Sequence, residues 1–117
     1  MLDANIWRAT RSLSGAALLA ARTPGVYAIG RVDRLHGLPV GAEWAYVGRT
    51  DSLRRRLLEH EPSVETNPGL RGWLRSNRDK LEVWLLTADA SISRRLERVL
   101  IREIQPLFNR IRYHEGN

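Results

Sequence analysis

Two short β-prone segments constrain the fold more than any other feature of this chain. The first, "PGVYAIG", covers residues 24–30, and the second, "WAYVGRT", covers residues 44–50. Short apolar runs that are rich in β-branched and aromatic residues and bounded by Gly or Pro are typical of strands. We therefore predict antiparallel strands over 25–32 and 43–48, joined by the loop "DRLHGLPVGAE". Each strand carries a central tyrosine, which is ordinarily a cross-strand packing residue.

The rest of the chain supplies one more strand and several helices. Leu81, Val83 and Leu85 alternate with other residues, which predicts a third strand over 80–87. Helical periodicity predicts helices within 1–22, 52–60, 70–77 and 91–104. The order α-β-β-α-α-β-α predicts an α/β (α+β) fold, in which a small three-stranded antiparallel sheet is flanked by helices.

Capping residues predict where two of these helices begin. Asp51 or Ser52 is expected to cap the helix that follows the second strand, because their side-chain oxygens accept hydrogen bonds from exposed helix N–H groups. Asp89 or Ser91 is expected to start the last helix, and Pro106 is expected to end it.

Length and composition predict one domain with terminal additions. The chain has 117 residues, of which 43% are hydrophobic, enough for a modest core. We divide it into an N-terminal helical extension over 1–22, a main domain over 23–112 and a tail over 113–117. The apolar run "GAALLAA" is far shorter than the ~20 residues of a membrane span, so no membrane partner is expected. The extension should be a surface helix whose inward side is formed by Ile6, Leu13 and Ala17.

A positive charge balance narrows the choice of partners. The formal net charge is +6 at pH 7 and the sequence pI is about 10.9, values that favour a polyanion such as nucleic acid. The chain has no cysteine, which excludes disulfides and thiolate metal ligands. The absence of cysteine also fits a cytoplasmic location, which we expect for this protein.

The segment "LRRRLLEH" predicts a helix with one buried side. At about 100° per residue, Leu53 and Leu57 mark the inward side of the helix. Arg56 and His60 flank this side, whereas Arg55 points away from it. The ordinary interpretation is a solvated basic helix. The alternative is that the flanking side chains are directed at a ligand.

The last helix combines an apolar arc with inward-leaning carboxylates. The arc is formed by Leu96, Val99, Leu100 and Ile104, and the opposite face carries Arg94, Arg95, Arg98 and Arg102. Glu97 and Glu103 lean toward the interior, where a carboxylate needs a cation, a metal or water. Periodicity does not single out Glu97, whose ordinary role would be a salt bridge. Asn109, twelve positions after Glu97, is by itself an ordinary turn or capping residue.

Taken in order along the chain, these features resemble the signature of the GIY-YIG endonuclease superfamily, over about residues 24–110. "GVY" at 25–27 and "YVG" at 46–48 differ from the family's name only by Val for Ile. A basic residue follows the second motif, and an arginine stands ten positions after its tyrosine. A histidine comes one helical turn later, a glutamate lies on a later helix, and an asparagine follows by twelve positions. These residues are Arg49, Arg56, His60, Glu97 and Asn109.

The resemblance implies a metal-dependent DNA endonuclease. Glu97 would hold one Mg²⁺ or Mn²⁺ ion, with waters and phosphate oxygens completing the coordination shell. Arg56 would bind the scissile phosphate as a permanently charged fork. Tyr27 is favoured as the general base and Tyr46 as the group that orients the water, with the reverse assignment as the alternative.

The remaining matched residues are assigned supporting roles by the same resemblance. Arg49 would favour an ionised tyrosine or meet the phosphate, and His60 would orient a tyrosine or contact the phosphate. Asn109 would hold the local backbone. We expect contacts with nucleic acid from Arg49, Arg54, Arg56 and His60.

Two alternatives to an independent nuclease stay open. The first is a nucleic-acid-binding module with the same fold but no turnover, which the net charge supports equally well. The second is a catalytic subunit that needs a protein partner or a dimer, because this sequence contains no DNA-recognition domain of the kind attached in other family members. The N-terminal helix, at Ile6 and Trp7, is where such a contact is expected. The DNA substrate would be duplex, single-stranded or branched.

Overall fold

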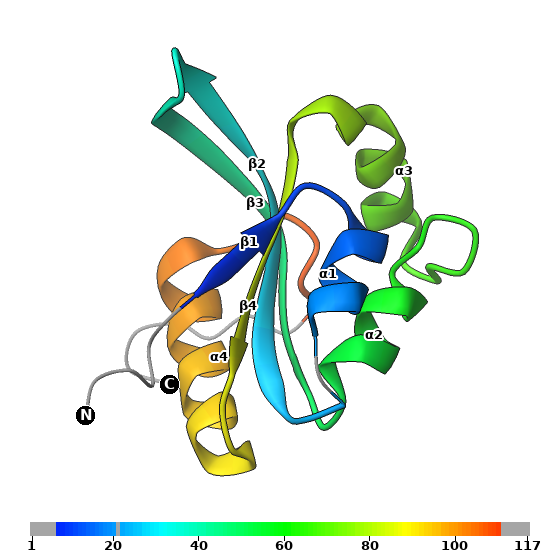
Figure 1. Ribbon diagram of the computed structural model, residues 1–117, viewed down its shortest axis with the longest axis vertical. Helices are drawn as coiled ribbons and strands as arrows, with labels where there is room; N and C mark the ends of the chain where they lie inside the picture. Colours follow the sequence, from blue (N-terminus) through cyan, green and yellow to red (C-terminus); the bar gives the residue numbers. More distant parts are fainter. Residues whose placement is uncertain (1–6, 21, 111–117) are drawn as a thin grey trace.

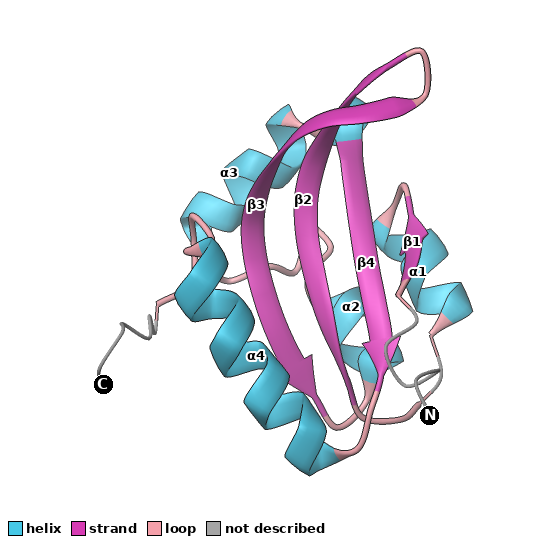
Figure 2. Ribbon diagram, turned by 90° about the vertical axis from the view of Figure 1, so that its left-hand side faces the viewer, coloured by secondary structure: helices cyan, strands magenta, loops and turns pink. Residues whose placement is uncertain are grey.

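The computed structural model describes residues 7–20 and 22–110, and these residues build one antiparallel sheet. The strands follow the order β1-β4-β2-β3 across the sheet, so that β2 and β4 are central and β3 is an edge strand (Figure 2). The strands are β1 Arg8–Thr10, β2 Gly25–Leu35, β3 Leu38–Thr50 and β4 Leu81–Thr87.

Helices cover both faces of this sheet. One face carries α4, and the other carries α1, α2 and α3 (Figures 1 and 2). The helical segments are α1 Leu13–Leu19, α2 Leu53–Glu59, α3 Pro68–Ser76, the 3₁₀-helix η2 Arg78–Lys80 and α4 Ala90–Ile104. Of the predicted alternatives, Ser52 caps α2 and Asp89 caps α4, each by accepting a hydrogen bond from a backbone N–H of the first turn.

Two apolar clusters hold the layers together. The cluster beneath α1, α2 and α3 includes Leu13, Leu53, Leu57 and the β2 residues Tyr27 and Ile29. The cluster beneath α4 is smaller and includes Val26, Ala28, Val47 and Ile101. Because alternate residues of a strand face opposite sides, β2 contributes to both clusters and is buried from Gly25 to Gly30.

The predicted α/β (α+β) class is confirmed, but the sheet has four strands rather than three. The additional strand, β1, lies where a helix was predicted. Its three residues pair with β4 and cover an edge that would otherwise present unpaired backbone groups. α1 follows as a seven-residue helix that buries Leu13 and Ala17 as predicted, whereas Ile6 lies outside the described residues.

The segment predicted as a loop at 33–43 is instead a β-hairpin that extends β2 and β3 beyond the rest of the sheet (Figure 1). His36 and Gly37 form its turn, and both have positive φ, at 50° and 87°. Positive φ at both central residues is the geometry of a tight turn between twisted strands. Pro39 is tolerated because β3 is an edge strand. Gly and Pro therefore mark a hairpin tip here.

α4 buries a slightly different face from the predicted one. Ser93 and Ile101 are its buried residues, and Glu97 is half-buried between them. Val99 is 40% exposed and Glu103 is also exposed, so their predicted places on the inward side are wrong. The helix packs on the sheet through positions 93, 97 and 101, with the predicted residues Leu96 and Leu100 beside them, and this orientation turns Val99 and Glu103 toward solvent.

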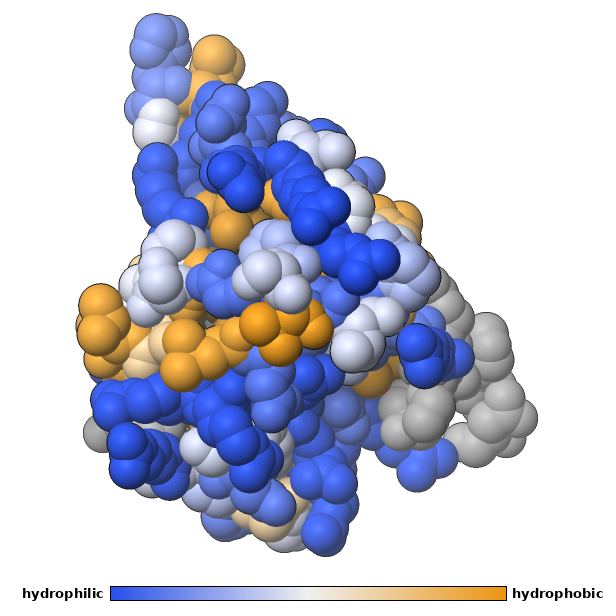
Figure 3. Space-filling view, turned by 90° about the vertical axis from the view of Figure 1, so that its right-hand side faces the viewer, coloured by the Kyte–Doolittle hydropathy of each residue, from blue (hydrophilic) through white to orange (hydrophobic). Residues whose placement is uncertain are grey.

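The face formed by α1, α2 and α3 is mostly hydrophilic, although a band of apolar side chains crosses it (Figure 3). Large apolar residues exposed on α1 and α2 include Leu18, Leu19 and Leu58. Within residues 7–20 and 22–110, no helix combines the length and the apolar composition that a membrane span requires.

Candidate active site

The two motif tyrosines lie on the same face of the sheet, next to α2. In the antiparallel pairing of β2 and β3, Tyr27 stands opposite Gly48 and Ile29 stands opposite Tyr46. The two phenol rings are therefore diagonal neighbours, with centroids 6.2 Å apart and planes inclined by 28°. Tyr27 is completely buried, whereas Tyr46 is half-buried.

The glycines of the two motifs permit close packing around these tyrosines. A Cβ at position 48 would meet the Tyr27 hydroxyl and would lie only 3.0 Å from the ring carbon Cε1. A Cβ at position 25 would meet the Leu86 carbonyl oxygen and would lie 2.6 Å from the Leu53 side chain. Gly48 therefore makes room for the Tyr27 ring, and Gly25 lets β2 approach β4 and α2.

Replacing Gly48 with alanine is expected to destabilise the fold by about 1–3 kcal/mol, because the new methyl group overlaps a rigid, buried ring. Gly72→Ala is the matched control, since a Cβ at position 72 meets nothing within 4 Å and α3 gains helix propensity. Chemical denaturation measures both free energies of unfolding. A Gly48→Ala protein as stable as the wild type would contradict the packing role of Gly48.

α2 places Arg56 and His60 beside the tyrosines. Leu53 and Leu57 anchor this helix in the core, so the residues that flank them meet the sheet. The His60 ring is fully buried, and its Nε2 lies 2.7 Å from the Tyr27 hydroxyl oxygen. The same ring packs against both tyrosines, with centroid distances of 5.2 Å.

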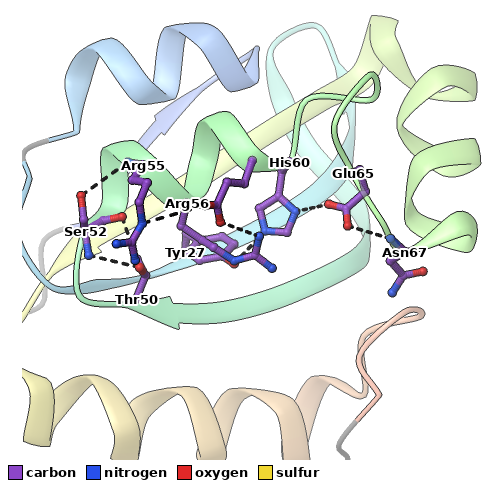
Figure 4. Close-up of polar contacts among 9 residues, drawn as sticks. Tyr27, Thr50, Ser52, Arg55, Arg56, His60, Glu65 and Asn67 are labelled. Atoms are coloured by element: carbon purple, nitrogen blue, oxygen red, sulfur yellow. Dashed lines mark hydrogen bonds and ion pairs between the residues drawn. The ribbon is translucent and has the colours of Figure 1, made fainter.

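The other nitrogen of His60 meets a buried carboxylate from the loop between α2 and α3. His60 Nδ1 contacts Glu65 Oε2, and Glu65 Oε1 accepts a hydrogen bond of 3.0 Å from the Asn67 backbone N–H. Figure 4 shows Tyr27, His60, Glu65 and Asn67 along one row of polar contacts.

Burial controls the protonation of this row. Burial, together with the charge of Arg56, lowers the pKa of His60 although Glu65 acts in the opposite direction, so the ring is neutral at neutral pH. Burial also raises the pKa of Tyr27 well above its ordinary value, and Tyr46 adds to this effect. The Tyr27 phenol therefore stays protonated.

Arg56 is a cation that lies beside Tyr27 in this row. Its Nη1 donates a hydrogen bond of 3.2 Å to Glu59, and the guanidinium is half-buried. Burial disfavours the charged form of Arg56 and lowers its pKa. Tyr27, Tyr46 and Glu59 have the opposite and larger effect, in part through a hydrogen bond with Tyr46, so that the pKa of Arg56 is raised. Arg56 is therefore a permanent positive charge beside both phenols.

A cavity of about 320 Å³ opens where these groups meet the edge strand β3. It is lined by Tyr46 from β3, Arg56 from α2, Glu97 from α4 and Asn109 from the segment after α4. Asn67 and Glu65, from the loop before α3, also line it. Polar groups from both helical layers therefore converge on one space at the side of the sheet.

Glu97 lies where this cavity adjoins a second one. The second cavity, of about 620 Å³, is lined by Glu97 and Ser91 together with Arg49, Arg94, Arg95 and Arg98. Burial raises the pKa of Glu97, and both the charge and the backbone N–H of Arg49 partly offset the effect. Glu97 is thus a carboxylate at the border of a strongly cationic surface.

The segment after α4 covers the free edge of β3. The backbone N–H groups of residues 107 and 108 donate hydrogen bonds of 3.1 and 2.9 Å to β3 carbonyls. The Asn109 side chain then acts as a neighbouring strand would: its Nδ2 donates to the Val47 carbonyl at 2.7 Å, and its Oδ1 accepts from the Val47 N–H at 3.0 Å. These bonds fix the β3 backbone immediately after Tyr46.

No protein-family model and no curated protein matches this chain. Solved structures do match. One is the GIY-YIG N-terminal endonuclease domain of UvrC from Thermotoga maritima, bound to its catalytic divalent cation, magnesium. The two sequences are 24% identical, the match covers 83% of this chain and 94% of that chain, and the TM-score is 0.53. A tyrosine-to-phenylalanine point mutant of that domain matches with 23% identity, coverages of 83% and 93%, and a TM-score of 0.53. This chain has the GIY-YIG fold.

The GIY-YIG fold brings most of the predicted site residues together. Four of them line the first cavity: Tyr46, Arg56, Glu97 and Asn109. Tyr27 does not line it but lies behind Tyr46, and Arg49 lines the adjoining cavity. Their roles in a reaction remain predictions, but their proximity is a property of the fold.

Two residues predicted to contact nucleic acid have other partners. Arg54 donates from Nε and Nη2 to the carbonyl oxygens of Ala17 and Ala20, at 2.9 to 3.1 Å. It thereby satisfies carbonyls at the C-terminal end of α1 and lines neither cavity. His60 is completely buried, so its ring cannot touch a phosphate in this conformation, and it contacts Tyr27 instead.

Glu65 and Asn67 are site residues that sequence reasoning missed. Both lie in the stretch "EPSVETNPG", whose Pro, Ser and Gly content indicates a loop. Asn67 caps α3 by accepting a hydrogen bond of 3.2 Å from the Leu70 N–H, and it donates to the Phe108 carbonyl at 3.1 Å. The one available signal was an acidic residue five positions after His60. Spacing within a loop does not predict where a side chain points, because a loop has no regular period.

Proposed function

We propose that this protein is a metal-dependent endonuclease that hydrolyses DNA phosphodiester bonds. One observation carries the proposal: a permanent cation, a carboxylate and a phenol, from Arg56, Glu97 and Tyr46, line the same cavity. Phosphodiester hydrolysis needs a positioned water, neutralisation of the phosphate charge and stabilisation of the leaving oxygen. The fold shared with the magnesium-bound endonuclease domain of UvrC supports the same reaction class.

The donor set fits one divalent cation held by Glu97. Mg²⁺ is commonly bound through one or two carboxylates and keeps several waters. Glu97 is half-buried at an open cavity, which leaves room for those waters. In the described part of the chain, no three His, Asp or Glu side chains gather into a closed metal site. A bound Mg²⁺ or Mn²⁺ ion would stabilise negative charge on the phosphate and on the leaving oxygen.

Arg56 and the tyrosines supply the remaining parts in this proposal. The Arg56 guanidinium binds the scissile phosphate, to which its planar fork donates two hydrogen bonds. We assign the contact with the attacking water to Tyr46, which lines the cavity, and the positioning of Tyr46 to Tyr27. This assignment reverses the one favoured by the resemblance, because Tyr27 is buried, with a raised pKa and no surface on the cavity.

The second cavity supports a nucleic-acid substrate. Its arginines, Arg49, Arg94, Arg95 and Arg98, adjoin Glu97 and would bind phosphates next to the scissile one. Backbone phosphates carry no sequence information, so these contacts would position DNA of many sequences.

A cleavage panel tests the proposed function. The purified protein is incubated with supercoiled plasmid, single-stranded DNA and branched DNA, each with Mg²⁺, with Mn²⁺ or with EDTA. We expect nicking that requires Mg²⁺ or Mn²⁺ and that EDTA abolishes. Binding of DNA without metal-dependent cleavage of any substrate would instead indicate a binding module with the same fold. Cleavage that appears only with a co-purified partner would indicate a catalytic subunit.

A further inference from the structure

Glu65 is a buried carboxylate that the proposed reaction leaves without a role. It is only 4% exposed, although it lies in the loop between α2 and α3. Removing a carboxylate from water is costly unless specific partners receive its oxygens. Both oxygens have such partners, because Oε1 accepts from the Asn67 N–H at 3.0 Å and Oε2 contacts the His60 Nδ1.

The chemistry of these partners determines where the protons lie. An ionised carboxylate can only accept hydrogen bonds, so the His60 Nδ1 that faces it must carry a proton. A neutral imidazole has one proton, which leaves the His60 Nε2 as an acceptor. The Tyr27 hydroxyl oxygen lies 2.7 Å from Nε2. The hydroxyl therefore donates a hydrogen bond to Nε2 and keeps its proton. Burial, which lowers the pKa of His60, keeps the ring in this neutral form.

We propose that Glu65 is a positioning residue of this site: it holds His60 in the Nδ1-protonated tautomer, so that Tyr27 must donate to Nε2. The Tyr27 hydroxyl then has one orientation, and its oxygen presents only acceptor lone pairs to its other neighbours. Because the Tyr27 and Tyr46 rings pack against each other and against His60, the row from Glu65 fixes the phenol that lines the cavity. The catalytic consequence rests on the proposed function, whereas the tautomer does not.

The row crosses two layers of the fold, which gives Glu65 an effect at a distance. Glu65 belongs to the α2–α3 loop, His60 ends α2, and Tyr27 lies on the central strand β2. Asn67, which binds the other Glu65 oxygen, also donates to the Phe108 carbonyl in the segment that covers β3. Glu65 therefore joins the loop that walls one side of the cavity to the tyrosine behind it.

Nitrogen NMR of labelled histidine tests the tautomer without any need for activity. The chain has three histidines, so a His60→Gln protein identifies the His60 ring signals by their loss. At neutral pH we expect the wild type to show a protonated Nδ1 and an unprotonated Nε2. In Glu65→Ala this preference should be lost, and Glu65→Asp should retain it in part because it keeps the carboxylate. A wild-type ring protonated at Nε2, or a ring unchanged in Glu65→Ala, would overturn the proposal.

Steady-state kinetics of cleavage test the positioning role. By analogy with groups that orient a metal-bound histidine, Glu65→Gln should lower kcat about 10- to 100-fold, with little change in KM. Glu61→Gln is the matched control, because Glu61 starts the same loop but does not line the cavity. If the wild type cleaves DNA and a Glu65→Gln protein that is folded by circular dichroism has the same kcat, the positioning role of Glu65 is overturned. The proposed nuclease function is then unaffected. Absence of cleavage by the wild type would instead count against the proposed function alone.

Discussion

Replacing Glu97 with glutamine is expected to lower metal-dependent cleavage by at least about 10³-fold while leaving the fold and DNA binding intact. The amide has nearly the shape of the carboxylate, but it lacks the negative charge that a divalent cation requires. The Gln oxygen can still accept the hydrogen bond from the Arg49 backbone, so stability should change little. Affinity for DNA should be retained or rise, because a negative charge leaves a cationic surface.

Glu103→Gln is the matched control for this variant. Glu103 lies on the same helix, but it is exposed and lines neither cavity. Single-turnover cleavage rates and calorimetric Mn²⁺ binding should change for Glu97→Gln alone. Cleavage by Glu97→Gln at a rate close to that of the wild type would remove Glu97 from the proposed metal site.

Replacing Arg56 with alanine is expected to reduce the cleavage rate by about 10²–10³-fold. A loss of this size is typical when one group that stabilises the negative charge of a transition state is removed. Arg56 is the cation that lines the first cavity from α2 and that stands beside both phenols. Arg56→Lys should restore only part of the rate, because an ammonium keeps the charge but not the planar fork.

Arg55→Ala is the natural control for this second variant. Arg55 is the preceding residue of α2 and pairs with the same acidic residue, Glu59, but it is exposed and lines neither cavity. Its removal should leave the cleavage rate within about twofold of the wild type, as is usual for surface substitutions. Equal rates for Arg56→Ala and Arg55→Ala on duplex and single-stranded DNA would contradict the phosphate-binding role of Arg56.

Patterns that repeat within one element were readable from the sequence. The apolar, β-prone composition of "GVYAIG" and "WAYVGRT" identified the paired strands, and the spacing of Leu53 and Leu57 identified the buried side of α2. Glu97 was correctly expected to lean inward on α4, although Glu103 was not distinguished from it. The error arose because periodicity gives the orientation of a helix only to within a residue or so, until packing selects one face.

Features that depend on two elements were decided only by the tertiary structure. The strand β1 required the open edge of β4, and the hairpin at 33–43 required the twist of β2 and β3. Arg54 and Arg56 are both arginines of the same helix, and the sequence does not distinguish their partners. In the structure, Arg54 donates to carbonyl oxygens at the C-terminal end of α1, whereas Arg56 lines the first cavity.

The sequence by itself determined the set of chemical groups: two tyrosines on paired strands, cations along α2 and α4, and an inward carboxylate. The tertiary structure decided which tyrosine reaches the cavity, because β2 is central and buries Tyr27 whereas β3 is an edge strand and leaves Tyr46 half-buried. It also brought Glu65 to His60. A loop residue has no periodic pattern, and its partner depends on where the chain places it in space.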